Sequence, residues 1–218
     1  MKITLVDGDL TNDFFMKCLD CLHIGVDTET SGVDRKKDSL ACVQVFAEHR
    51  DEPECMIVRR FNDEPSNLMK LLSNSRNLKI FHHAPFDLEF MMRDFKGLRP
   101  RACACTKLMA KIIDPHRTKF YDPNKERAGH TLAALVYTLC GVKLDKKLAV
   151  SNWFASELSS EQVAYAVNDI RYLPTIYRDL IDAMTPDQIE DYIGAIQALP
   201  VKIKMELDYG KTDLYGYE

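Results

Sequence analysis

The sequence lacks any long hydrophobic run, and this absence bears on membrane association. Its longest purely apolar stretches, such as residues 132–137, fall far short of the roughly 20 residues that a membrane-spanning helix requires. The opening MKITLVDGDL also lacks the apolar segment of a secretory signal peptide. From these two absences we expect a cytoplasmic protein without a membrane partner.

An excess of positive charge is absent as well. The chain carries 29 lysines and arginines against 33 acidic residues, so its formal net charge is -4 at pH 7. A protein that grips long nucleic acid over a broad face needs many cationic side chains to neutralise the phosphates. We therefore expect any bound polyanion to be short, or to be held locally by metal ions.

The cysteines lack the pattern of a disulfide framework or a zinc site. There are seven of them, an odd number, scattered through apparent strands and helices. This usage suits reduced, buried thiols. Cys18-x-x-Cys21 and Cys103-x-Cys105 have no second pair at a matching interval, so no structural zinc is predicted.

What the sequence does contain is the composition of an ordinary folded domain. Its 218 residues are 46% hydrophobic and 28% charged, and they show no internal repeat or low-complexity segment. We predict one domain over residues 1–200 and a tail over residues 201–218 that packs on the domain or on a neighbouring subunit. The apolar side chains of this tail are Val201, Ile203, Leu207, Tyr209, Leu214, Tyr215 and Tyr217.

Hydrophobic periodicity predicts an α/β protein with helices on both faces of a sheet. Strands are predicted at residues 1–10, 24–26, 40–47, 55–58 and 78–83, the third and fourth of them forming part of a β-meander. Helices are predicted near residues 14–22, 65–72, 85–95, 106–113, 131–140, 159–177 and 186–199. Residues 115–129, which have no apolar period, are predicted to form a mobile loop.

Acidic side chains occupy special positions in three of these elements. Asp27 and Glu29 end a buried strand and point the same way, because strand side chains repeat every second residue. Asp87 falls in the first turn of a helix that begins at Pro85. An isolated Asp-x-Glu pair commonly marks the place where a strand reaches solvent. This pair therefore indicates a functional site only in combination with the other acids.

The third acidic position lies on a helix with clear local signals. Ser159 and Gln162 form a capping box, and Tyr165 and Asp169 are i,i+4 neighbours beside the buried stripe. That stripe consists of Val163, Ala166, Val167, Ile170, Leu173 and Tyr177. A phenol and a carboxylate can therefore meet a common ligand on this helix.

Convergence of these acids would be costly without cations, because like charges disfavour ionisation. With two divalent ions about 3.5–4 Å apart, such a cluster can activate a water and neutralise charge on the attacking and leaving oxygens of a phosphodiester. Oxygen ligands favour Mg²⁺ or Mn²⁺ over zinc. A nearby tyrosine hydroxyl could orient the water.

The complete pattern resembles a known family. Asp27-x-Glu29, Asp87 in HHAPFD, and Tyr165-x-x-x-Asp169 resemble the three motifs of the DEDDy 3′–5′ exonucleases, the tyrosine branch of the DnaQ-like superfamily. The segments Cys105-Thr106-Lys107, HTLAALVYTLCGVKLDK, Ser151-Asn152-Trp153 and LSSEQVAYAVNDIRYL look like the ribonuclease D-type domain. The resemblance covers about residues 20–182 and is closest to the bacterial nanoRNase C-type enzymes.

This resemblance implies a fold, a mechanism and a set of roles. The fold would be RNase H-like, with a five-stranded mixed sheet flanked by helices. Asp27 would bridge two divalent cations, Glu29 and Asp169 would hold the water-activating one, and Asp87 would support the other. Tyr165 would position the water that releases a nucleoside 5′-monophosphate.

The resemblance also implies a substrate and an assembly. We expect short single-stranded RNA to be favoured over DNA, and a homo-oligomer such as a ring. A DNA-directed exonuclease remains an alternative, because His83, Pro85 and Asn152 depart from the usual motifs and leave the substrate preference open. A catalytically silent nucleic-acid-binding protein is a weaker alternative, because all four acids and Tyr165 are present. The candidate substrate contacts are Thr28, Thr30, Gln44, His82 and Phe86. Phe86 could equally pack in the core, and Trp153 is predicted to lie in the core or an interface.

Overall fold

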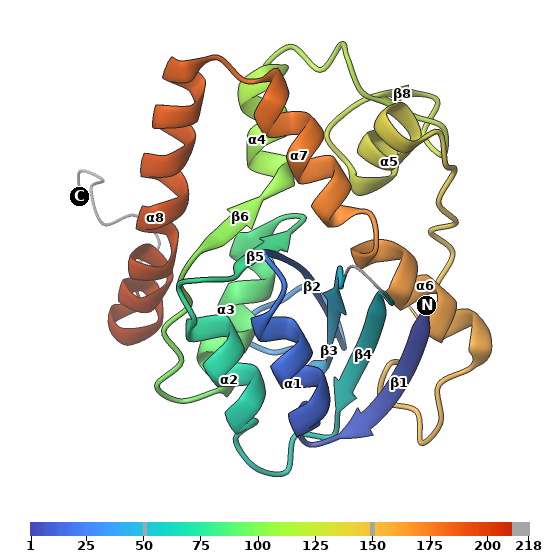
Figure 1. Cartoon of the computed structure of the whole chain (residues 1–218), viewed down its shortest axis with the longest axis vertical. Coiled ribbons are helices and arrows are strands. Elements are labelled where there is room, and N and C mark those ends of the chain that lie inside the picture. The colour runs from blue at the N-terminus through green and yellow to red at the C-terminus, as the bar shows by residue number, and fades with distance from the viewer. Residues whose placement is uncertain (50–51, 149–150, 211–218) are drawn as a thin grey trace.

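The computed structural model describes residues 1–49, 52–148 and 151–210, and its centre is a six-stranded sheet (Figure 1). The strands lie in the order β1-β4-β3-β2-β5-β6. Their bounds are β1 Lys2–Asp7, β2 His23–Thr30, β3 Leu40–Ala47, β4 Glu54–Arg59, β5 Leu78–Phe81 and β6 Cys103–Cys105. The mixed sheet was predicted, but it has one strand more than the five that the resemblance implies.

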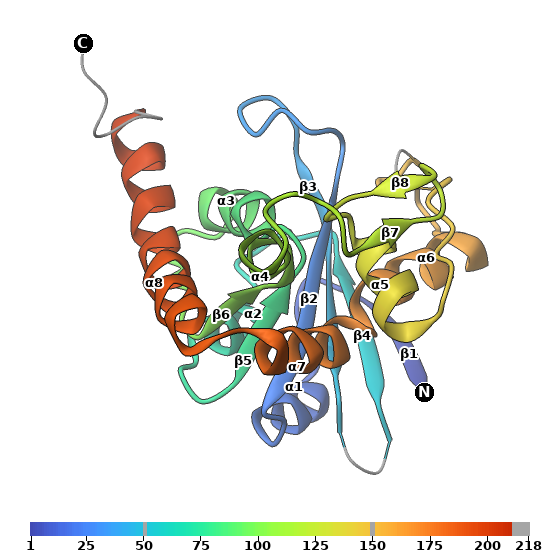
Figure 2. The ribbon, with the colours of Figure 1, turned by 90° about the horizontal axis from the view of Figure 1, so that it is seen from above.

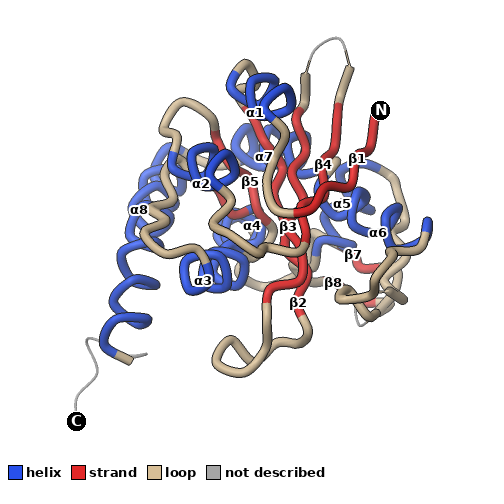
Figure 3. The backbone as a smooth tube through the Cα atoms, turned by 90° about the horizontal axis from the view of Figure 1, so that it is seen from below, coloured by secondary structure: helices blue, strands red, loops and turns tan. Residues whose placement is uncertain are grey.

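The strand directions place the carboxyl ends of three strands at the same end of the sheet. β2, β3 and β4 form the predicted antiparallel meander, and β1 pairs with β4 in parallel. β5 runs parallel to β2, and β6 runs parallel to β5. The carboxyl ends of β2, β5 and β6 therefore meet at the end of the sheet from which the loop over residues 31–39 projects (Figure 3).

Helices cover both faces of the sheet. α1, α2 and α3 lie on one face, and α5, α6 and α7 lie on the other (Figure 1). α8 stands at the β6 edge, where it packs against α3 and α4 (Figure 2). The helices are α1 Asn12–Leu19, α2 Ser66–Ser73, α3 Ala84–Asp94, α4 Thr106–Ile113, α5 Leu132–Cys140, α6 Ser160–Ile170, α7 Leu173–Ala183 and α8 Pro186–Tyr209. No helix in the described ranges is both long and apolar enough for a membrane span.

Local sequence signals explain several helix ends. Ser159 and Gln162 form the predicted reciprocal capping box at the start of α6, and α5 stops at Gly141, whose φ of +70° is accessible to glycine. The apolar stripe predicted for one long helix is divided between α6 and α7. Arg171 and Tyr172 separate these two helices, and the stripe continues because Leu173 is also buried.

The structure departs from the sequence predictions in two irregular segments. Residues 115–129 contain a small hairpin, in which β7 (Tyr121–Asp122) pairs with β8 (Arg127–Ala128). α8 continues through Pro200 instead of ending before it. Burial of Ile203, which is 2% exposed, gives the last turns an anchor that offsets the hydrogen bond lost at the proline. The predicted apolar tail residues Leu214, Tyr215 and Tyr217 lie outside the described residues.

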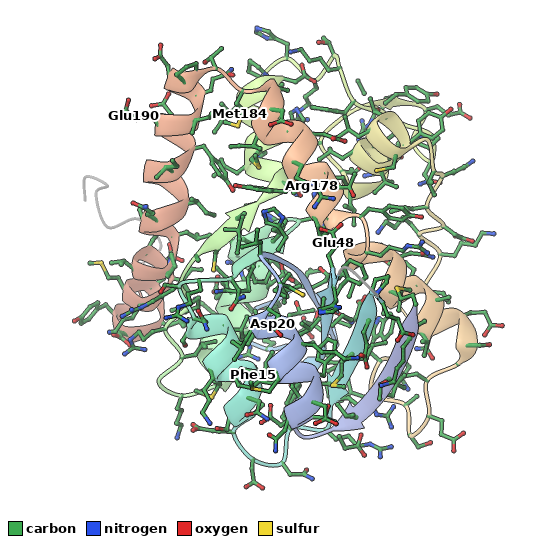
Figure 4. The ribbon with its side chains drawn as sticks, in the orientation of Figure 1. Phe15, Asp20, Glu48, Arg178, Met184 and Glu190 are labelled. Carbon is green, nitrogen blue, oxygen red and sulfur yellow. The ribbon has the colours of Figure 1, made fainter. Side chains whose placement is uncertain are left out.

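Close packing joins α6 and α7 to the sheet. A Cβ atom on Gly25 of β2 would lie 2.6 Å from the backbone oxygen of Ile170, so only glycine lets α6 approach the strand this closely. On α7, Arg178 donates to both carboxylate oxygens of Glu48, which follows β3, at 2.5 and 2.9 Å (Figure 4). These contacts fix the end of α6, and hence Asp169, beside the end of β2.

Candidate active site

Three of the predicted acids converge at the carboxyl end of β2. Asp27, Glu29 and Asp169 each offer a carboxylate oxygen, and these oxygens all lie within 4.8 Å of one another. Strand alternation directs Asp27 and Glu29 together, and the contact between Gly25 and Ile170 brings α6 to them. The geometry is that of a site for a cation with oxygen ligands.

Asp87 joins the cluster from the first turn of α3. The chain enters α3 through His83, a non-glycine residue in the left-handed region with φ of +84°, which makes the turn after β5 sharp. The Thr28 hydroxyl then donates to Asp87 Oδ1 at 2.7 Å. The negative charge of Asp87 acts on Asp27, so all four predicted acids share one electrostatic environment.

Burial and mutual repulsion make these carboxylates hard to ionise. Burial raises the pKa of Asp27 well above its usual range, and the charges of Asp87 and Glu29 raise it further. Burial and then Asp169 raise the pKa of Glu29 to about 9. Burial raises the pKa of Asp87 to about 7 against the opposing hydrogen bond from Thr28. A divalent cation would relieve this strain, and an all-carboxylate donor set fits Mg²⁺ or Mn²⁺.

A lysine that the sequence reasoning missed completes the site. Lys146 Nζ donates to Asp169 Oδ1 at 2.6 Å and lies 5.1 Å from the centre of the Tyr165 ring. It belongs to the loop between α5 and α6, within the segment HTLAALVYTLCGVKLDK. That segment was noted for its resemblance to ribonuclease D, but nothing in its spacing distinguished this lysine from its neighbours.

Tyr165 stands beside the acids as a protonated donor. Burial and the adjacent Asp169 and Glu29 charges raise the pKa of its phenol, so the hydroxyl keeps its proton throughout the physiological range. Trp153, which is 3% exposed, packs against the Tyr165 ring with 5.9 Å between the two ring centres. The prediction of a buried tryptophan is confirmed, and its neighbour is the candidate water-positioning residue.

Three of the candidate substrate contacts are engaged within the protein. Thr28 is buried and holds Asp87, and the Thr30 hydroxyl donates to the carbonyl of Gly32. Gln44 lies opposite Asp27 in the register of β2 and β3. Its side chain is fully buried, so it exposes no atom to a nucleotide. Of the three, Thr28 contacts one of the acids directly, through its hydrogen bond to Asp87.

His82 and Phe86 are placed better to meet a ligand. The Thr106 hydroxyl donates to the Phe81 carbonyl, so His82 Nδ1–H must donate to Thr106 Oγ1, 2.9 Å away. His82 Nε2 is then a buried acceptor without a partner in the described part of the chain. Phe86 is half-buried against Phe90, with ring centres 5.0 Å apart, so it combines core packing with partial exposure.

The raised pKa values predict an unusual pH dependence for the metal-free protein. A carboxyl with a higher pKa in the folded state binds its proton more tightly when folded. Its favourable effect is complete below roughly pH 4 and is lost as the pH rises through about 7 for Asp87 and about 9 for Glu29. In EDTA we expect the melting temperature to fall from pH 5 to pH 9, by on the order of 10 °C if Asp87 alone contributes ~3 kcal/mol over that range.

Differential scanning calorimetry over this range is the measurement. The drop should shrink in Asp87→Asn and persist in Asp63→Asn, which removes an exposed surface acid. Millimolar Mg²⁺ should restore stability at pH 8, because a ligand that binds only the folded state stabilises it. A melting temperature that is flat or rises with pH in EDTA contradicts the prediction.

Lys146 should matter most when no divalent cation is bound. In EDTA at pH 8, Lys146→Met leaves the buried Asp169 without its ion-pair partner, and we expect the melting temperature to drop by several degrees. The stabilisation that Mg²⁺ gives should be larger in this variant than in wild type. Lys147→Met is the matched control, since Lys147 is 88% exposed. Equal behaviour of the two variants would contradict a special role for Lys146.

A mixed α/β sheet with four acidic side chains and a tyrosine gathered at the end of one strand fits the class of metal-assisted phosphodiester hydrolases. Comparison with known proteins makes the assignment specific. The chain belongs to a 3′–5′ exonuclease family, whose model matches residues 3–184.

Curated relatives share this domain within longer proteins. DNA polymerase I of Aquifex aeolicus is 26% identical over 174 residues, which cover 78% of this chain and 26% of the polymerase. Ribonuclease D of Haemophilus influenzae is 29% identical over 158 residues, which cover 72% of this chain and 36% of that enzyme. The chain thus spans about a quarter to just over a third of the length of these relatives.

Solved structures match over more of their length. NrnC of Brucella melitensis has a TM-score of 0.81 at 25% identity, with 100% of both chains covered. RNase D of Escherichia coli shares the fold, with a TM-score of 0.72 at 21% identity over 94% of this chain and 51% of that chain. The prediction of a DnaQ-like, ribonuclease D-type 3′–5′ exonuclease is confirmed.

Proposed function

We propose that this enzyme removes nucleoside 5′-monophosphates from the 3′ end of short single-stranded RNA. The observation that carries the proposal is the convergence of Asp27, Glu29, Asp87 and Asp169 beside Tyr165. Ribonuclease D relatives favour RNA as the substrate. A structure of Brucella melitensis NrnC bound to pGG favours a short strand.

The four acids are proposed to hold two divalent cations, Mg²⁺ or Mn²⁺. Another NrnC structure with bound Mg²⁺ supports this choice. Asp27 would contact both ions, Glu29 and Asp169 would hold one, and Asp87 would hold the other. When bound, the ions would lower the pKa of a water and offset charge on the attacking and leaving oxygens.

The side chains around the acids would bind and orient the strand. Tyr165 Oη, which stays protonated, would hold the attacking water by a hydrogen bond without removing its proton. His82 Nε2 would accept a hydrogen bond from a sugar hydroxyl at the 3′ end, which would satisfy this buried acceptor. The partly exposed ring of Phe86 would contact a base.

A length series of 5′-labelled RNA and DNA, from dinucleotides upward, tests the proposal. With Mg²⁺ or Mn²⁺ we expect RNA products shortened stepwise from the 3′ end, and no turnover in EDTA. Equal or faster turnover of matched DNA would favour the DNA-directed alternative. Binding without any turnover in either metal would favour a catalytically silent protein.

A homo-oligomer is also proposed, on the strength of α8. Three large apolar side chains of α8 are exposed: Ile193 is 44% exposed, Val201 60% and Tyr209 67%. Exposed apolar side chains on one helix are typical of a surface that contacts another protein chain. We expect light scattering to give a mass several times the 25.0 kDa of one chain. A monomeric mass at micromolar concentration would count against the oligomer.

A further inference from the structure

A basic cavity of about 510 Å³ lies between the start of α4 and the β7–β8 hairpin. Its one acidic lining residue, Asp122, is already engaged, because its carboxylate oxygens accept from the Asn124 backbone and the Thr131 hydroxyl. The cationic lining residues are Lys107, Lys111, Arg117, Lys125 and Arg127. We call these five side chains the basic cavity.

The cations of the basic cavity form no ion pair within the described part of the chain. Among residues 1–49, 52–148 and 151–210, none of the five takes part in an ion pair or a side-chain hydrogen bond, whereas Arg59, Arg93 and Arg178 do. Burial lowers the pKa of Lys107, and the charges of Lys111 and Lys125 lower it further. A chain with a net charge of -4 thus gathers five cations at one place, and an anion from outside would offset the repulsion between them.

The basic cavity is linked to the candidate active site through His82 and Lys146. Lys107 follows Thr106, whose hydroxyl contacts His82, and burial followed by the charges of Lys107 and Lys146 lowers the pKa of His82. Lys146 in turn bonds to Asp169. His82 therefore lies within the field of both the basic cavity and the catalytic centre, at the common edge formed by the ends of β5 and β6.

We propose that the basic cavity binds backbone phosphates of the substrate strand on the 5′ side of the cleaved linkage. The inference rests on the proposed function, because a 3′ terminus held at the acids can continue only in the 5′ direction. Lysine and arginine contacts to phosphate are independent of base sequence, so the site would hold any sequence. It would also explain how a protein with net negative charge retains a polyanion.

The test is binding of a 5′-labelled hexaribonucleotide, followed by fluorescence anisotropy with Ca²⁺ in place of Mg²⁺. Lys111→Gln/Arg127→Gln removes two exposed cations of the basic cavity. We expect Kd to rise about tenfold and the slope of log Kd against log salt to fall by about 1.4, or about 0.7 for each lost phosphate contact. In hydrolysis assays KM should rise more than kcat falls.

Lys70→Gln/Arg76→Gln, on α2 and the turn that follows it, is the matched control with the same change in charge. Equal effects of the two double variants on RNA affinity would overturn the inference. It would also be overturned if Lys111→Gln/Arg127→Gln lost binding of pyrophosphate but kept the RNA affinity of wild type. If the cavity variant melts early, Lys125→Gln at the hairpin turn should still give half of the slope change. If the wild-type protein binds RNA without cleaving it, the proposed function is refuted. The comparison of RNA affinities then still decides whether the basic cavity binds the strand.

Discussion

Replacing Asp27 with asparagine is expected to lower kcat on a short RNA by on the order of 10³-fold or more. Asp27 is the acid that the charges of Asp87 and Glu29 both reach, so it occupies the centre of the cluster. Asparagine keeps the shape of the side chain and removes its charge, which lowers the affinity of the cluster for every divalent cation that it would hold. Initial rates on 5′-labelled RNA in Mg²⁺, with rates in Mn²⁺ alongside, provide the measurement.

Stability separates loss of catalysis from loss of fold. Because Asp27 is held among like charges, Asp27→Asn should melt in EDTA at the same temperature as wild type or higher. Asp20→Asn, at the exposed end of α1 (Figure 4), should leave both rate and melting temperature near wild type. Turnover by Asp27→Asn within tenfold of wild type would contradict the proposed site.

The acids were predictable because each depends on a local rule. Strand alternation joins Asp27 to Glu29, and Pro85 sets Asp87 in a first helical turn. The capping box fixed the start of α6, which set the direction of Asp169 relative to its own helix. The convergence of the acids depends on a contact between distant segments, the approach of Ile170 to Gly25. Rules based on local sequence do not predict such a contact. Only the family resemblance predicted it.

The features that escaped prediction depend on long-range packing. Lys146 lies in a loop without periodicity, and its partner Asp169 is 23 residues away. α8 passes Pro200 because Ile203 finds a buried place that a propensity rule cannot anticipate. The β7–β8 hairpin has only two residues in each strand, too few for an alternating pattern to be visible. This hairpin contributes to the basic cavity, so the surface proposed to hold phosphates could be found only in three dimensions.

Replacing Tyr165 with phenylalanine is expected to lower kcat by roughly 10²-fold while leaving RNA affinity in Ca²⁺ unchanged. Phenylalanine keeps the ring that packs against Trp153 and lies near Lys146, so the fold and the acid cluster should survive. Only the hydroxyl is lost, and its raised pKa makes it a donor that orients water and not a base that takes a proton.

The shape of the pH profile distinguishes these two roles. A positioning hydroxyl lowers kcat by the same factor from pH 6 to pH 9, whereas a general base would make the deficit grow as the pH rises and the wild-type phenol ionises. Tyr137→Phe, which alters a tyrosine that is 40% exposed on α5, is the control for loss of a phenol elsewhere. A Tyr165→Phe enzyme with wild-type kcat would mean that the water is oriented by the carboxylates and cations alone, and the tyrosine would then contribute only packing on Trp153.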